Sequence, residues 1–182
     1  MRIKPSDRQI VVDLETLSVR PNSCITSIGA VAFNLQDGIL EEFFINVDPV
    51  TCKEAGLHID KETVAWWATQ PKEAIDSWKK DPVPLDEAID KFVTFYGDKS
   101  IPIWGNGSSF DVTILESSLY ALGWQTGKLP WKFWDIYDMR TLTSVLGRKL
   151  EKTGINHNAL HDAIAEAKLI MDMRETLLPQ LY

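Results

Sequence analysis

Apolar residues along the chain occur in short continuous runs and in stripes with helical spacing. The continuous runs, rich in β-branched residues, predict strands near residues 9–14, 24–33 and 41–47, at 101–104, and near 132–135. The helical stripes, with their capping residues, predict helices from Asp60 to Pro71, over 85–96, from 110 to about 122, over 138–146, and from about 158 to 178. Three opening strands followed by helices and short strands predict an α/β fold, a mixed sheet flanked by helices.

The length and composition predict a single domain over residues 1–182. The 182 residues are 45% hydrophobic, enough for one core, and no linker, repeat or low-complexity tract divides them. The start of the chain lacks the apolar run of a signal peptide, and no segment is long and apolar enough to cross a bilayer. Cys24 and Cys52 form no C-x-x-C pair, so neither a disulfide scaffold nor a zinc site is suggested. We therefore expect a cytoplasmic protein that does not bind membranes.

The net charge of −7 is unusual for a protein that handles polyanions. The excess acid lies in residues 1–127, which carry 11 basic and 19 acidic residues, whereas residues 128–182 carry 8 and 7. Bound divalent cations would offset part of this charge where a phosphate must dock. Binding through metals and local contacts is therefore compatible with the charge, but tight non-specific coating of nucleic acid is not.

The first candidate site is the pair Asp13 and Glu15, in the apolar strand that begins at Ile10. Side chains two apart on a strand share a face, so the two carboxylates lie side by side. Their repulsion and desolvation require a proton or a cation between them, unless the strand end is simply solvated. Mg²⁺ and Mn²⁺ prefer such oxygen ligands.

The second candidate is Asp111, which follows the turn at residues 105–109 and stands near the first residue of a helix. One interpretation is purely structural, because an acid at a helix N-terminus is stabilised by the helix dipole. The surroundings favour a functional role. Glycines let the backbone approach closely, Asn106 offers an amide, and Phe110 can anchor the turn in the core.

The third candidate is the pair His157 and Asp162. Residues five apart lie about 140° from each other around a helix, so the two cannot share a face if both are helical. We therefore expect His157 on the loop that enters the helix, after Gly154, with Asn156 or Asn158 as the cap. An imidazole in this place suits a general base. His161 should leave the helix on another face as an exposed structural residue, and His58 is expected to be structural as well.

Together the three clusters resemble the DEDD superfamily of 3′→5′ exonucleases, in its histidine-bearing branch. The chain carries D-x-E at Asp13, N-x3-F-D ending at Asp111 and H-x4-D ending at Asp162, in the order and spacing of that family over about 150 residues. The resemblance implies a ribonuclease H-like fold, with Asp13, Glu15, Asp111 and Asp162 as metal ligands and His157 as general base. A finer resemblance is to compact phage and prophage exonucleases and related bacterial exoribonucleases, carried by residues 13–16, 64–67, 104–107 and 137–142.

The implied activity is a two-metal hydrolysis of phosphodiester bonds with two Mg²⁺ or Mn²⁺ ions in the site. One ion activates a water while His157 accepts its proton, and the other stabilises the departing 3′ oxygen. The expected substrates are 3′ ends of DNA or RNA, single-stranded or overhanging, and the product is a 5′-mononucleotide. A homodimer is left open, since dimers are common among such relatives, but no heptad or exposed apolar stripe in the sequence argues for one.

Three alternatives remain beside this reading. A ribonuclease H-like endonuclease would use the same ligand spacing, and a non-catalytic nucleic-acid-binding module would keep the same fold. A glycosidase is disfavoured, because its two carboxylates flank the scissile bond, whereas Asp13 and Glu15 lie on one side.

The expected substrate contacts surround these clusters. Thr16 and Leu17 directly follow the D-x-E pair and should line the same pocket. The side chains of Trp66 and Trp67 point about 100° apart on a helix. Either both pack against the core from two sides, or one of them is exposed and stacks on a base of the substrate. Arg140 holds a phosphate or pairs with Asp138 or Asp135. Asn106 and Phe110 complete the set.

Overall fold

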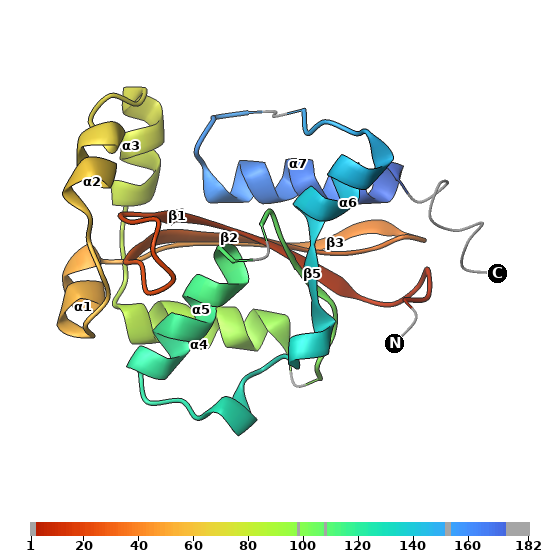
Figure 1. The fold of residues 1–182 in the computed structure, drawn as a ribbon, viewed down its shortest axis with the longest axis horizontal. Coiled ribbons are helices and arrows are strands. Elements are labelled where there is room, and N and C mark those ends of the chain that lie inside the picture. The colour runs from red at the N-terminus through yellow and green to blue at the C-terminus, as the bar shows by residue number, and fades with distance from the viewer. Residues whose placement is uncertain (1–2, 98, 108, 152–153, 174–182) are drawn as a thin grey trace.

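A mixed sheet forms the centre of the molecule (Figure 1). The computed structural model describes residues 3–97, 99–107, 109–151 and 154–173. Within them the sheet has five strands in the order β3-β2-β1-β4-β5, with β2 antiparallel to both β1 and β3, and with β4 and β5 parallel to β1. The strands are β1 Gln9–Thr16, β2 Ile25–Asn34, β3 Gly38–Asn46, β4 Ile103–Gly105 and β5 Ile136–Asp138.

Helices cover both faces of this sheet. Figure 1 shows α6 and α7 on one face, α4 and α5 on the other, and α1 to α3 grouped at one end. The α-helices are α1 Pro49–Glu54, α2 Lys61–Trp67, α3 Lys72–Lys79, α4 Leu85–Tyr96, α5 Asp111–Ala121, α6 Met139–Leu146 and α7 Ala159–Asp172. Two short 3₁₀ turns, η1 Thr126–Lys128 and η2 Phe133–Asp135, precede β5.

Alternate residues of β1 belong to two different hydrophobic cores. Ile10, Val12 and Leu14 pack in the core that includes residues of α4 and α5, whereas Val11 packs in the core that includes α7. Because side chains alternate along a strand, Asp13 and Glu15 share the α7 face with Val11. The alternation therefore directs both carboxylates toward one helix.

Helix α7 lies unusually close to the sheet. A Cβ atom added to Gly29 of β2 would lie 2.1 Å from the backbone carbonyl carbon of Ala159, so only glycine fits there. Gly29 is paired with Asp13, and Ala159, Ala163 and Ala167 of α7 are fully buried. These small residues let the helix backbone approach the strand that carries Asp13.

The architecture confirms the predicted α/β fold, but local differences appear. The strand expected near 132–135 is wrong: this segment is the 3₁₀ turn η2, and β5 begins only at Ile136. The reason is a tertiary contact: Ser100 Oγ, from a distant segment, accepts the N–H of Lys132 and donates to Asp135 Oδ2, which closes the segment into a turn. The final predicted helix ends at Asp172, and its expected extension over 174–178 lies outside the described residues.

Two helices were not predicted. α1 follows Asp48, whose side chain accepts the N–H of Val50, and Pro49 occupies its first turn. α3 follows Pro71, which therefore starts a helix, while α2 already ends at Trp67. In the described part of the chain, no helix has both the length and the apolar character needed to cross a membrane.

Candidate active site

The two carboxylates of β1 occupy the α7 face of the sheet near the end of the strand. Glu15 is buried, with 7% of its surface exposed, and Asp13 is partly buried. Their strand partners are Gly29 and Ser27 of β2, and the absence of a side chain at Gly29 lets the start of α7 approach these carboxylates. The predicted side-by-side arrangement of these carboxylates follows directly from the strand geometry.

Asp111 joins this group from the first residue of α5. It is 2% exposed, and both its oxygens accept backbone hydrogen bonds: Oδ1 from Leu14 N–H at 3.2 Å and Oδ2 from Asn106 N–H at 3.1 Å. A Cβ atom at Gly105 would lie 3.1 Å from Asp111 Oδ2, so this glycine allows the close approach. Asn106 thus contributes its backbone N–H to the turn. Phe110 packs against the core, as predicted.

The third group comes from the loop before α7 and from the first turn of that helix. His157 has a left-handed backbone with a φ of 60°, and Asn158 caps α7 by accepting the N–H of His161. Asp162 is 4% exposed. His157 therefore stands outside the helix, as the five-residue spacing required.

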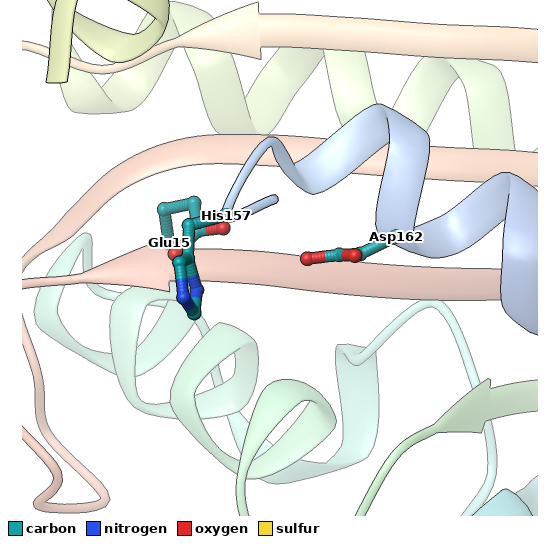
Figure 2. A group of neighbouring side chains, drawn as sticks. All are labelled: Glu15, His157 and Asp162. Carbon is teal, nitrogen blue, oxygen red and sulfur yellow. The ribbon is translucent and has the colours of Figure 1, made fainter. Parts of the chain in front are cut away.

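Three of the predicted residues converge closely. Figure 2 shows Glu15 from β1 beside His157 from the loop, with Asp162 pointing toward both from α7. Each offers one ligand atom, and these atoms all lie within 4.8 Å of one another. Such a group of two carboxylates and an imidazole has the donor chemistry of a cation site.

Two tryptophans hold the imidazole of His157. The ring centroids of His157 and Trp66 are 5.0 Å apart with planes at 85°, and those of His157 and Trp67 are 6.0 Å apart at 79°. Trp67 is 3% exposed and donates from Nε1 to the carbonyl oxygen of Thr16 at 2.8 Å, whereas Trp66 is 44% exposed. Trp67 is therefore the core residue of the pair, and Trp66 is the one that solvent reaches.

His161 holds the loop that carries His157. Its Nδ1 accepts the N–H of Ile155 at 3.0 Å, and a Cβ atom at Gly154 would lie 2.7 Å from the same nitrogen. Gly154 also has a φ of 88°, which favours glycine. The expectation of an exposed residue is wrong for His161, which is partly buried and bonded to the loop. His58 has a separate structural role, since its Nδ1 lies 2.8 Å from Ser18 Oγ in the β1–β2 connection.

Glu166 is an acid of this region that the sequence reasoning missed. It stands one helical turn after Asp162 on α7 and is 1% exposed. A glutamate inside a helix usually lies on the solvated face, and only its four-residue spacing from Asp162 hinted otherwise. Of the neighbouring charges, that of Glu166 raises the pKa of Asp13 the most.

The electrostatics of the group follow from burial and from like charges. Burial is the largest cause that raises the pKa of Asp13 well above its ordinary value. Four neighbouring carboxylates raise this pKa further: Glu166, Asp111, Glu15 and Asp162. Burial also raises the pKa of Asp111 to about 6, although the N–H groups of Asn106 and Leu14 and the charge of Arg140 oppose the rise. The cluster therefore favours bound protons or cations.

A cavity of about 440 Å³ opens beside these residues. Its walls include Thr16, Phe110 and both tryptophans, together with Leu14, Glu15, Val19, Asp60, Glu62 and Thr63. Leu17 does not line this cavity: its side chain lies in the core, and its backbone bonds to Cys24 and Asp60. The expectation that Leu17 lines the pocket therefore fails, because the strand alternation and the turn after Thr16 direct it inward.

Arg140, at the start of α6, lies beside the turn that leads to Asp111. Its guanidinium carbon would be 3.7 Å from a Cβ atom at Gly107. Among the described residues it forms no ion pair with Asp138 or Asp135. Instead Asp138 Oδ1 accepts the backbone N–H of Arg140. The guanidinium of this exposed residue is close enough to Asp111 for its charge to oppose the rise in the pKa of that carboxyl.

Solved structures show the same fold. Exonuclease I of E. coli in complex with a dT13 oligonucleotide matches with a TM-score of 0.64 and 13% identity, over 97% of this chain and 42% of that one. Exonuclease I from Methylocaldum szegediense matches with a TM-score of 0.63 and 17% identity, over 96% and 42%. Cell-death related nuclease 4 matches with a TM-score of 0.57 and 15% identity, over 94% and 65%. The chain thus spans less than half of each exonuclease I.

These likenesses establish the fold class as ribonuclease H-like, as the sequence predicted. No curated protein sequence matches the chain. The family described as 3′-5′ exoribonuclease Rv2179c-like domain matches residues 8–173, and the chain belongs to this family.

Proposed function

We propose that the protein is a metal-dependent 3′–5′ exonuclease that releases 5′-mononucleotides from single-stranded or overhanging 3′ ends. The observation that carries the proposal is the convergence of Glu15, His157 and Asp162 within 4.8 Å, beside Asp13 and Asp111, in a chain of this family. These residues come from three separated segments. A purely structural role would not require these charged side chains to lie close together.

The residues present fit a pair of divalent cations. Carboxylate oxygens of Asp13, Glu15, Asp111 and Asp162 are the hard donors that Mg²⁺ and Mn²⁺ prefer. The raised pKa of Asp13 reflects its burial and, after that, the like charges around it. When bound, the two cations would offset this charge, polarise the phosphate and make a water more acidic. A zinc-bound form of E. coli exonuclease I with single-stranded DNA is a precedent for a divalent cation in such a fold.

His157 is proposed to accept the proton of the attacking water. Its ring is held edge-on by two indoles, so it needs little reordering before it acts. The loop position allows small movements toward the substrate that a residue inside α7 would not have. A general base of this kind contributes roughly 10²–10⁴-fold to the rate.

The remaining contacts are proposed to position the 3′-terminal nucleotide. The cavity between Thr16, Phe110 and Trp66 has the size and the partly apolar walls expected of a small-ligand site. The guanidinium of Arg140, beside the turn that leads to Asp111, is available for a phosphate of the nucleic-acid strand. RNA is the first substrate to test, because the family description names exoribonucleases; the exonuclease I structures hold DNA oligonucleotides.

The test uses 5′-labelled single-stranded RNA and DNA of the same sequence, each with a 3′-hydroxyl or a 3′-phosphate. We expect stepwise shortening from the 3′ end in Mn²⁺ or Mg²⁺, blocked by the 3′-phosphate and by EDTA. The matched control is Asp13→Asn, which keeps the shape of the side chain and removes its charge.

Two outcomes would contradict the proposal. Cleavage of a closed circular strand would favour an endonuclease with the same site. Binding of the labelled strands without cleavage in either metal would favour a non-catalytic module.

A further inference from the structure

An anchored turn presents two aromatic side chains to solvent at the beginning of β5. Trp131, just before the turn, is 2% exposed, donates from Nε1 to Glu116 Oε1 at 2.8 Å, and packs against Tyr96 and Phe92. Asp135, at its end, is 3% exposed and accepts a 2.6 Å hydrogen bond from Ser100. The same Ser100 oxygen accepts the N–H of Lys132 at 2.9 Å. Both ends of the turn are therefore fixed to the body of the protein.

Between these anchors, Phe133 and Trp134 point outward. Phe133 is 80% exposed and Trp134 is 57% exposed, and their ring centroids lie 4.7 Å apart with planes at 76°. Neither ring contributes to the two hydrophobic cores. Large aromatic residues that a rigid turn holds in water typically mark a binding surface.

The stretch of sequence that carries this aromatic pair is basic, whereas the whole chain is acidic. No acidic residue occurs between Glu116 and Asp135, and this interval contains Lys128 and Lys132, although the protein carries a net charge of −7. Asp135 itself is buried and hydrogen-bonded. Flat rings beside lysines in an otherwise acidic protein suit a single-stranded nucleic acid, whose bases stack and whose phosphates are anionic.

The aromatic pair is connected to the proposed active site by β5. Asp138, the last residue of β5, pairs with Gly105, which begins the turn to Asp111, and Arg140 follows two residues later. Figure 1 shows β5 running between η2 and the start of α6. Three strand residues span about 10 Å, which separates the aromatic pair from the start of α6, where Arg140 lies.

We infer that Phe133 and Trp134 form a stacking platform for bases of the single-stranded substrate upstream of its 3′-terminal nucleotide. The inference rests on the proposed function for the identity of the substrate. The platform adds affinity for longer strands, whereas the 3′-terminal nucleotide binds in the cavity beside Glu15.

The experiment compares the wild type with Phe133→Ser/Trp134→Ser. Binding of 5′-fluorescein oligouridine of two and of about 12 nucleotides is measured by fluorescence anisotropy in EDTA, and hydrolysis of the same strands in Mn²⁺. We expect the double variant to lose roughly tenfold or more in affinity and in kcat/KM for the long strand, because stacking contributes to each bound base. Turnover of the dinucleotide should stay unchanged.

Val145→Ser is the matched control, since Val145 is 78% exposed on α6 and does not belong to the aromatic pair. Equal effects of the double variant on both lengths, or no effect on either, would overturn the platform. A lower molecular mass of the double variant in light scattering would also overturn it, because the pair would then be a contact between two copies of the chain. If the wild type binds the long strand but cleaves nothing, the proposed function fails, and the anisotropy still decides the platform.

Discussion

The two sides of the proposed centre are built in different ways. On the strand side, Asp13 and Glu15 project from β1 and Asp111 from the start of α5. Asp111 accepts the backbone N–H groups of Leu14 in β1 and of Asn106, which directly follows β4. On the loop side, His157 stands in a left-handed conformation and depends on Trp66, Trp67 and the bond between His161 and Ile155. The strand side is placed by the fold as a whole, and the loop side by a few local contacts. We therefore expect mutations on the two sides to fail differently.

The largest effect is expected from Asp13→Asn on the strand side. Loss of this carboxylate should reduce hydrolysis to the background of the assay, because the charge that holds the cations is removed, while the fold is kept. Asp13 is a cleaner target than Asp111, because both oxygens of Asp111 accept backbone N–H groups. In Asp111→Asn the side-chain NH₂ group would face one of these N–H donors and destabilise the fold. The measurement is single-turnover hydrolysis at saturating Mn²⁺ with circular dichroism of the purified variant. Turnover near that of the wild type would remove Asp13 from the centre.

The next effect is expected at His157 on the loop side. His157→Asn should lose ~10²–10⁴ in kcat, the share of a general base, while Mn²⁺ binding by calorimetry is largely kept. Asparagine is the matched replacement, because it tolerates the left-handed backbone that alanine would strain. If Mn²⁺ binding falls as steeply as the rate, His157 is a ligand rather than a base.

A third effect concerns stability and distinguishes the strand side from the loop side without any substrate. Because the folded pKa of Asp111 is about 6 and that of Asp13 is also raised, the metal-free native state binds more protons than the unfolded chain above about pH 4. This contribution to stability is present at low pH and is lost as the pH rises through about 6. In EDTA, Asp13→Asn should therefore raise Tm at pH 7.5, by about 2–4 °C for each kcal/mol gained, and change it little near pH 4. His157→Asn should show no such pH-dependent gain in Tm. An equal gain in Tm in both variants would contradict the expected difference between the strand side and the loop side.

The smallest effect is expected from the residue that holds the loop. His161→Ala removes the acceptor of Ile155 N–H and should lower kcat by roughly tenfold with little change in KM, because His157 is displaced rather than lost. His161→Asn should restore most of the rate, since its amide oxygen can take the place of Nδ1. The chain has three histidines, so their ring protons are readily separated by NMR. The His157 signal, shifted by the two indoles, should move in His161→Ala and return in His161→Asn; an unmoved signal would mean that His161 does not position His157.

The same contrast explains how far the sequence could predict the site. The face shared by Asp13 and Glu15, the helix start at Asp111 and the loop position of His157 follow from strand and helix periodicity, which are local rules. The α/β class followed from the order of the same elements, and the ribonuclease H-like fold from the resemblance to the exonuclease family. The sequence could not show that Trp66 and Trp67 meet His157, because this contact joins residues about 90 positions apart.

Three further features escaped prediction for related reasons. A glutamate within a helix is typically exposed, and Glu166 is buried only because α7 packs on the sheet. The turn at Phe133–Asp135 was mistaken for a strand, because its aromatic residues have high β-propensity and the Ser100 bonds that close it come from a distant segment. Leu17 was placed in the pocket by its sequence neighbours, although the chain turns inward after Thr16.

The close contact of α7 with Gly29 has a consequence for folding. β1 and β2 lie near the beginning of the chain, whereas the helix that supplies Asp162, together with the loop before it, is formed by late residues. During synthesis the ribosome delivers the strands first, and the acidic face of β1 stays incomplete until α7 docks on it. Docking of α7 is thus the step that brings the strand side and the loop side of the proposed centre together.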